Sequence, residues 1–352
     1  MSVVVSMGNK FDRIIEKSPK NLVENGISKF GTFDSLIENI NIRDTKKPVK
    51  AGYANSFKNT RLKEWEAFEI NFKEGFLGGA IYSIGYAISN VMFFYDKRTN
   101  TIVSNQEFGR FKKGAIKPSL ADTINYYKTR NIEIEIRNNF KNGKCIINST
   151  SSKKKKSPFM QVNVEITSVA KPSVVVLPLD ENRPLYTHKE LFSVEGKIKI
   201  GDEVFIMDEN STCVIDDHKA FYPFSMHYDW ITCFEKNKQG KLIGFNLTKN
   251  QVKNQLKYNE NYVWSEGELI MLPPVEFKKF KNKWHIYDVN KEGIIDLYFD
   301  INNAYKVKAN AGLFKINYIA PFGKISGKIK IKEQVFDFTD FCGFAEDKTY
   351  RM

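Results

Sequence analysis

The chain has 352 residues, of which 42% are hydrophobic and 14% aromatic, so it can form a large core and two domains and is not a disordered chain. It contains no apolar run of about 18 residues that would predict a membrane span, no signal-peptide pattern at its start, and no CxxC pair among its four cysteines that would suggest zinc or disulfides. We therefore expect a cytoplasmic protein. The net charge of +13 comes from lysines spread along the whole chain, which predicts a solvated basic surface and no nucleic-acid partner.

The first 50 residues are polar and contain two glycine turn signals. Within residues 63–72, apolar and charged residues alternate as in a half-buried strand. Residues 132–151 predict a hairpin that turns at Asn142-Gly143. Alternation or a short apolar run predicts further strands in residues 76–108, 159–169, 172–180, 213–248, 267–280, 284–289 and 293–301. Long helical periodicity is nearly absent, and many short strands with frequent turns indicate a sandwich or barrel.

A short repeat indicates that the chain contains two copies of one β domain. Residues 196–205 read GKIKIGDEVF, and residues 327–336, which lie 131 positions later, read GKIKIKEQVF. Both copies run on to an acidic pair, Asp216-Asp217 in the first and Glu346-Asp347 in the second. Such self-similarity predicts a duplicated supersecondary unit, with a ligand site between or inside the two copies.

The densest polar cluster in an otherwise apolar stretch lies just after the first copy of the repeat. It consists of Asp216, Asp217, His218, Tyr222, His227, Tyr228, Asp229 and Trp230. A buried carboxylate beside a histidine could work as a general acid and base. The alternative is a domain junction at which these side chains satisfy loop backbone groups. No HxH or HExxH spacing is present, so we predict no metal site.

Other candidates lie elsewhere in the chain. Glu260 precedes Tyr262 and Trp264, and a carboxylate beside aromatic rings can have a raised pKa; the alternative is a polar turn. Tyr186 could line a barrel mouth or an exposed hairpin end, and Glu346 could point into the second barrel or cap it. The aromatic residues Trp65, Tyr82 and Tyr86 could line a barrel interior or only pack in the core.

Several common site motifs are absent from the sequence. The glycines of residues 75–85 lie between predicted strands and form no dinucleotide fingerprint, and there is no GxSxG motif or P-loop. The run Lys153, Lys154, Lys155 and Lys156 could make a weak contact with an anionic membrane or form a solvated loop. We therefore predict no nucleotide cofactor.

The order of several motifs resembles the domain-of-unknown-function family 2804. The motifs are KEWEAFEI, GYAISNVMFFYD, VVLPLDENRPLYTHKELFSVEGKIKI, VIDDHKAFYPFSMHYDWITC, KLIGFNLT and APFGKISGKIKI with GFAED, within residues 20–350. The series Asp217-His218, Trp230 and Gly240 is also similar to the AttH and carotenoid 1,2-hydratase group. That likeness implies two lipocalin-like barrels, with cofactor-free hydration, cyclisation or pericyclic chemistry on apolar polyenes or related natural products.

The same resemblance implies that Asp217, His218 and Trp230 are pocket residues. This chain departs from the group's pattern in two places: it has an aspartate pair in place of a single aspartate, and residues 226–228 read Met-His-Tyr in place of smaller residues. The repeat and the resemblance together predict an all-β fold of two tandem lipocalin-like, calycin-like antiparallel β-barrels with few short helices. The first domain would comprise residues 1–210 with an N-terminal extension, and the second residues 211–352.

The first functional hypothesis is a cofactor-free hydratase, isomerase or cyclase that acts on an apolar, unsaturated small molecule in a barrel pocket. The predicted catalytic residues are Asp217, His218, His227 and Glu260, and the predicted ligand-binding residues are Trp65, Tyr86, Tyr186, Asp216, Tyr222, Trp230, Trp264 and Glu346. An acid of this set would protonate the substrate, a histidine would orient the acid or accept a proton, and the tryptophans would shield the developing cation. The alternatives are a carrier of lipids or pigments, and a basic protein that binds nucleic acid or anionic membranes.

Overall fold

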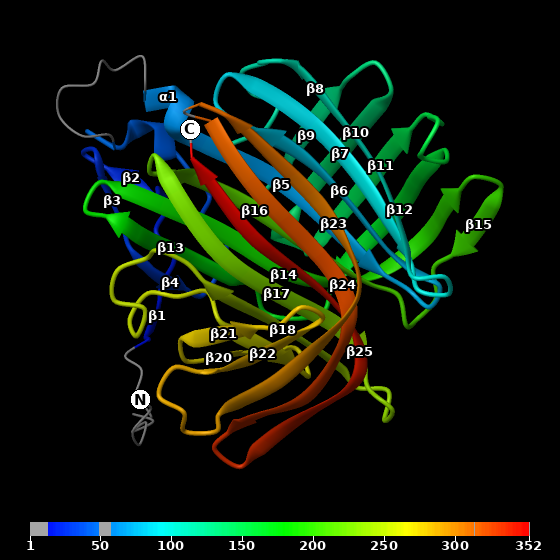
Figure 1. The fold of residues 1–352 in the computed structure, drawn as a ribbon. Coiled ribbons are helices and arrows are strands. Elements are labelled where there is room, and N and C mark those ends of the chain that lie inside the picture. The colour runs from blue at the N-terminus through cyan, green and yellow to red at the C-terminus, as the bar shows by residue number, and fades with distance from the viewer. Residues whose placement is uncertain (1–12, 49–57, 313, 352) are drawn as a thin grey trace.

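The structure is a computed structural model that describes residues 13–48, 58–312 and 314–351. These residues are nearly all in strands, and they form two curled antiparallel half-barrels that follow one another along the chain (Figure 1). The predicted fold class is thereby confirmed. The helical segments within the described ranges are short: η1 (Ile42–Asp44), α1 (Lys58–Arg61) and η3 (Phe140–Asn142). No helix in this part of the chain is long and apolar enough to cross a membrane.

The first sheet has 14 strands, and its main path runs β8-β7-β6-β5-β16-β14-β12-β11-β10-β9. The strands on this path are β5 (Leu62–Asn71), β6 (Gly75–Ser83), β7 (Ala87–Asp96), β8 (Thr101–Arg110), β9 (Thr123–Lys128), β10 (Ile132–Asn139), β11 (Lys144–Ser151), β12 (Met160–Ser168), β14 (Arg183–Ile200) and β16 (Thr212–Phe221). Beside the path lie β1 (Ile15–Glu16), β4 (Gly31–Phe33), β13 (Ser173–Asp180) and β15 (Glu203–Ile206). The predicted hairpin of residues 132–151 is confirmed as β10 and β11.

The second sheet has nine strands in the order β20-β19-β18-β17-β25-β24-β23-β22-β21. Its strands are β17 (Ser225–Lys236), β18 (Leu242–Lys249), β19 (Tyr262–Ser265), β20 (Glu268–Met271), β21 (Val275–Lys279), β22 (Lys283–Asp288), β23 (Ile295–Ala311), β24 (Phe314–Ile331) and β25 (Gln334–Arg351); β2 (Val23–Glu24) and β3 (Ile27–Ser28) form a separate pair. The chain passes from the first sheet to the second between Phe221 and Ser225. The domain boundary predicted near residue 210 therefore precedes the last strand of the first sheet.

The repeated sequence occupies equivalent places in the two sheets. Each copy ends a strand of 18 residues, β14 or β24, and leads through a tight turn into β15 or β25. Gly196 and Gly327 have φ values of +122° and +125°, which side-chain-bearing residues rarely adopt. A Cβ atom at either glycine would overlap the carbonyl oxygen of Asn163 or Asp296 on the neighbouring strand. The repeat therefore marks a close backbone approach that both halves need.

Large apolar residues gather in three main clusters. One fills the first half-barrel around Phe68 and Phe192, and one fills the second around Phe245 and Phe299. The third lies between the halves, where Phe76 stands among phenylalanines of β17, β24 and β25 with ring centroids 5.5–5.7 Å apart. Burial of aromatic surface is the main force that can hold two such halves together.

The alternation of side chains gives β5, β14 and β16 two different faces. Phe68 of β5 and Phe192 of β14 join the core of the first half-barrel, whereas Trp65 of β5 and Leu185 of β14 join the cluster between the halves. On β16 the odd-numbered Cys213 and Ile215 face the interior and Val214 faces the other half. Strands that most sheets would expose on one side are therefore buried on both.

Candidate functional site

A cavity lies between the two half-barrels. Its volume is about 450 Å³, and its wall contains residues of β5 to β8, β14 and β16 from the first sheet and of β17, β18 and β23 to β25 from the second. Apolar side chains make up much of this wall, including Val91, Phe93, Ile102, Phe108, Val307, Ile316, Phe322 and Phe344. A cavity of this size and composition can bury a drug-sized apolar ligand.

Asp216 and Lys189 form a buried ion pair in the wall of this cavity. The Lys189 Nζ lies 2.6 Å from Oδ2 of Asp216, and Thr187 Oγ1 donates to the other carboxylate oxygen at 3.3 Å. Burial lowers the pKa of Lys189, but the charges of Asp216 and Glu260 and the hydrogen bond to Asp216 together hold this pKa above its ordinary value. The ammonium also lies 5.3 Å from the ring centroid of Trp230. Lys189 is therefore fixed as a cation with its partners inside the protein.

Glu69, which the sequence analysis did not single out, is the acid best placed for proton transfer. It lines the cavity from β5, is 6% exposed, and its Oε2 has no hydrogen-bond partner among the described residues. Burial, followed by the charge of Asp216, raises its pKa well above the ordinary 4.5. The raised pKa favours the protonated form of Glu69, which can donate its proton into the cavity.

Glu260 supplies a second acid to the same cavity. Burial raises its pKa to about 7, the charge of Asp216 adds to this, and Lys189 opposes it. Asn250 donates to Glu260 Oε1 at 3.4 Å. Glu260 therefore changes its protonation state close to neutral pH, as a general acid or base of an enzyme must.

His218 stacks on Trp65 and stays neutral. The two rings are nearly parallel, at 2°, with centroids 3.7 Å apart, and Nε2 of His218 lies 3.0 Å from the Tyr222 hydroxyl. Burial, with a smaller contribution from Lys189, lowers the pKa of His218 well below its usual range. A neutral imidazole can accept a proton or orient a water molecule.

The second half contributes a cluster of tyrosines around Glu346. The hydroxyls of Tyr228 and Tyr318 donate to the two carboxylate oxygens of Glu346 at 2.7 and 2.5 Å. Lys348, two residues further along β25, lies over the rings of Tyr228, Tyr318 and Tyr82. This cluster and the acids around Asp216 line the same cavity.

The structure brings part of the predicted site together. The predicted residues that line the cavity are Trp65, Asp216, His218, Tyr222, Trp230, Glu260 and Glu346. The predicted residues outside its lining are Tyr86, Tyr186, Asp217, His227 and Trp264. Tyr86 is 57% exposed at a turn, and Trp264 is buried against Tyr262, with its indole nitrogen 3.0 Å from the Lys171 carbonyl oxygen.

Asp217 lies on the opposite face of β16 from Asp216, inside the first half-barrel. It is fully buried and accepts from Lys219 Nζ at 2.6 Å. Its neighbour Glu66 accepts a hydrogen bond from Asn125, and burial, followed by the charge of Asp217, raises the pKa of Glu66 to about 8. The Lys219 ammonium lies 5.7 Å from the ring centroid of Tyr186, which packs in a separate cluster with Val174 and Val176 of β13. Because adjacent residues of a strand face opposite ways, the predicted aspartate pair is divided between two environments.

His227 lies on the surface, in a cluster with Asp229 and Asp347. Its ring nitrogens are 3.4 Å from Asp229 Oδ1 and 3.9 Å from Asp347 Oδ1. The ammonium of Lys279 bonds to both carboxylates, at 2.6 Å to Asp347 Oδ2. Lys279 therefore supplies the positive charge that these two aspartates need.

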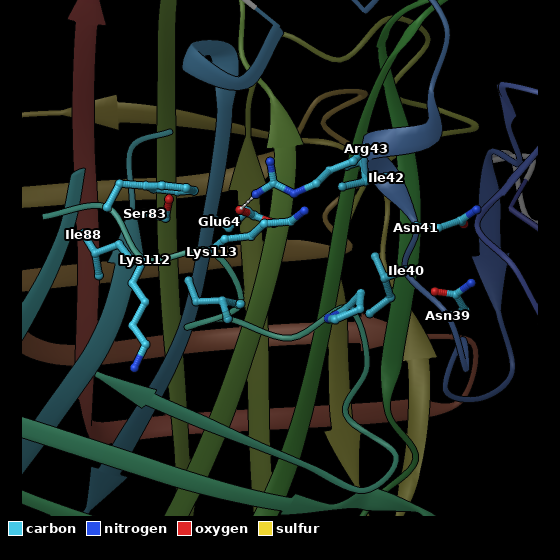
Figure 2. A pocket seen from close by; sticks show the side chains of 14 residues that line it. Asn39, Ile40, Asn41, Ile42, Arg43, Glu64, Ser83, Ile88, Lys112 and Lys113 are labelled. Carbon is cyan, nitrogen blue, oxygen red and sulfur yellow. Dashed lines mark hydrogen bonds and ion pairs between the residues drawn. The ribbon is translucent and has the colours of Figure 1, made fainter. Parts of the chain in front are cut away.

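A smaller cavity of about 240 Å³ lies at one end of the first half-barrel. Figure 2 shows residues 39–43 on one side of it and Lys112 and Lys113 near Ser83 and Glu64 on the other. Glu64 is bonded to the Arg43 guanidinium across this cavity. None of the residues predicted for the site lines it, and its acid is already paired.

Solved structures of similar fold include CghA in complex with Sch210972, with a TM-score of 0.50 at 6% identity over 83% of this chain and 88% of that chain. Kievitone hydratase from Nectria haematococca also has a TM-score of 0.50, at 10% identity over 82% of this chain and 88% of the hydratase. An AttH-type protein from Nitrosomonas europaea has a TM-score of 0.47 at 12% identity, over 85% and 98% of the two chains. The expected likeness in fold to a hydratase is thereby confirmed.

No curated protein matches the chain by sequence. The model of the family described as domain of unknown function DUF2804 matches residues 13–352. This match includes both half-barrels and every residue that lines the cavity between them. The chain therefore belongs to the DUF2804 family, as the order of its motifs predicted.

Proposed function

We propose that this protein is an enzyme that protonates a carbon–carbon double bond of an apolar small molecule in the cavity between its halves. The observation that carries the proposal is Glu69, a buried acid with a raised pKa and an oxygen without a partner among the described residues. The likeness in fold to kievitone hydratase supports a hydratase or a related isomerase or cyclase. We propose no cofactor for this step, because the acid and water supply all of its atoms.

In the proposed reaction, Glu69 gives its proton to one alkene carbon, and a carbocation forms at the other. The Asp216 carboxylate and the ring faces of Trp65 and Trp230 line the cavity and would stabilise that cation. Water then adds to the cationic carbon, and the proton that this water loses returns to the Glu69 carboxylate. Loss of a proton from a neighbouring carbon instead of water addition would give the isomerase outcome.

The neutral imidazole of His218 acts as the base in this reaction. It is held between Trp65 and the Tyr222 hydroxyl, so it can orient the attacking water or take its proton before the proton returns to Glu69. Glu260, with a pKa of about 7, can share that task. These roles keep the kind of chemistry that the sequence analysis predicted, but they assign the proton donor as Glu69 in place of Asp217 or Glu260.

The test uses deuterium, because a proton donated to carbon leaves a label whatever the product. The protein is incubated in D₂O with a panel of isoprenoids and prenylated phenols, and the mass of each compound is then measured by mass spectrometry. We expect at least one compound to gain carbon-bound deuterium or the elements of D₂O with the wild type, and the Glu69→Gln variant to lose this activity.

Glu66→Gln is the matched control, because Glu66 is on the same strand and its side chain faces the interior of the first half-barrel. This variant should label the compound at the wild-type rate. Retained labelling by Glu69→Gln would refute the proposed acid. Bound compounds that no variant labels would instead support a carrier of apolar molecules.

A further inference from the structure

Lys348 is a cation of the cavity whose charge no carboxylate neutralises. It lines the cavity from β25, and its ammonium has no hydrogen bond or ion pair with any other described residue. Lys189, the other lysine of the lining, differs in this respect because Asp216 holds it at 2.6 Å. An ammonium has three donors, and those of Lys348 are available to whatever enters the cavity.

Aromatic rings surround this ammonium. The Lys348 Nζ lies 5.5 Å from the ring centroid of Tyr82, 5.9 Å from that of Tyr228 and 5.3 Å from that of Tyr318. Tyr82 belongs to the first sheet and the other two tyrosines to the second. Cation–π attraction from three rings can hold the ammonium in place without consuming its donors.

The nearby carboxylate of Glu346 is already engaged. Each of its oxygens accepts a hydrogen bond from a phenol, one from Tyr228 and one from Tyr318, and it forms no ion pair with Lys348 within 4.0 Å. The same two tyrosines therefore bind Glu346 through their hydroxyls and face Lys348 with their rings. This arrangement separates the two charges and leaves the cation for a ligand.

We infer that Lys348 anchors an oxygen of the substrate, so that the substrate is an apolar, ring-containing molecule with an anionic or strongly accepting oxygen, such as an enolate, a phenolate or a conjugated carbonyl. The inference rests on the proposed function and adds the substrate class to it. The flat rings of the tyrosines suit an oxygen attached to an unsaturated ring, and Phe93 and Phe322 of the same wall suit the rest of its body. Lys348 would orient the substrate while Glu69 delivers the proton.

The test compares two fluorescent probes that share one aromatic body. 8-Anilino-1-naphthalenesulfonate carries an anionic oxygen group, and N-phenyl-1-naphthylamine does not. We expect the wild type to bind both, and Lys348→Met to weaken binding of the sulfonate about tenfold, as loss of a charge-assisted hydrogen bond does. Affinity for the neutral probe should stay within about twofold, which also shows that the variant is folded. Lys348→Arg should keep most of the sulfonate affinity.

Lys306→Met is the matched control for surface charge. Lys306 is exposed on β23, between Tyr305 and Val307, which both line the cavity, so its side chain points away from the site. This variant should bind both probes as the wild type does. An equal loss of both probes in Lys348→Met, or no loss of either, would overturn the anchoring role and leave the proposed reaction standing. Failure of the wild type to bind either probe would overturn both proposals, whereas retained deuterium labelling by Glu69→Gln would overturn only the proposed acid.

Discussion

Replacement of Glu69 by glutamine should change the way in which stability depends on pH. Glu69 is 6% exposed, and burial, reinforced by the charges of Asp216 and Glu346, raises its pKa well above the ordinary 4.5. The folded protein thus binds this proton more tightly than the unfolded chain does. The contribution of Glu69 to stability is therefore fully present below about pH 4.5 and is lost as the pH rises towards the folded-state pKa.

The size of this loss follows from the linkage between proton binding and folding. Each pH unit between the two pKa values removes about 1.4 kcal/mol from the free energy of unfolding of the wild type. Glutamine has nearly the same shape and no proton to lose, so the Glu69→Gln variant lacks this part of the slope. Its stability relative to the wild type should therefore increase by about 1.4 kcal/mol for each pH unit above about 4.5, until the folded-state pKa is reached.

The assay is urea unfolding followed by circular dichroism at several values between pH 5 and pH 8, for the wild type and the variant. The midpoint and the slope with urea are compared at each pH, because an unchanged slope shows that the same surface unfolds. Glu195→Gln, an exposed glutamate of β14, is the control and should follow the wild type. If the stability of Glu69→Gln depends on pH in the same way as that of the wild type, Glu69 is ionised at neutral pH and cannot be the proposed acid.

Two further predictions concern the fold. Lys219→Met should destabilise the protein by about 3–5 kcal/mol, because Lys219 and Asp217 are both almost fully buried and the Asp217 charge would lose its partner. The double variant with Asp217→Asn should recover most of that loss in urea unfolding. A double variant as unstable as the single one would contradict this explanation. Gly327→Ala should cost about 1–3 kcal/mol from backbone strain plus the overlap with Asp296, whereas Gly293→Ala, which also has a positive φ but no atom within 4 Å, should shift the unfolding midpoint less.

The fold could be predicted because its signals are local. Alternation in residues 63–72 and the Asn-Gly turn after Asn139 each report the conformation of a few neighbouring residues, and the structure has β5 and the β10–β11 hairpin there. The repeated GKIKI segment reported a duplicated unit because the glycine at its start is required in both halves by backbone contact. Because the same steric requirement applies at both positions, glycine is found at both.

The site could be predicted only in part, because it depends on which face of a strand each residue occupies. The acidic pair at 216–217 was visible, but on a strand buried on both sides the pattern does not tell which member faces the cavity. Glu69 was hidden among charged residues that suggested a solvated face, although it has the same parity as Trp65. Lys348 and its tyrosines come together through the pairing of β25 with β17 and β24 and the approach of these strands to β6, which no short motif encodes.

One wall of the protein serves two interiors. The strands β5, β14 and β16 carry Glu69, Lys189 and Asp216 on the face towards the cavity, and β16 carries the buried Asp217–Lys219 pair on its other face. An insertion or deletion of one residue within β16 would exchange the two faces, and it would place Asp217 in the cavity and Asp216 in the core. Variation in these three strands is thus confined to substitutions, whereas the ends of the outer strands can change in length. In evolution, new substrates would accordingly be acquired through the far wall of the cavity at residues 305–309 of β23, where the side chains between the lining residues Tyr305, Val307 and Ala309 are exposed.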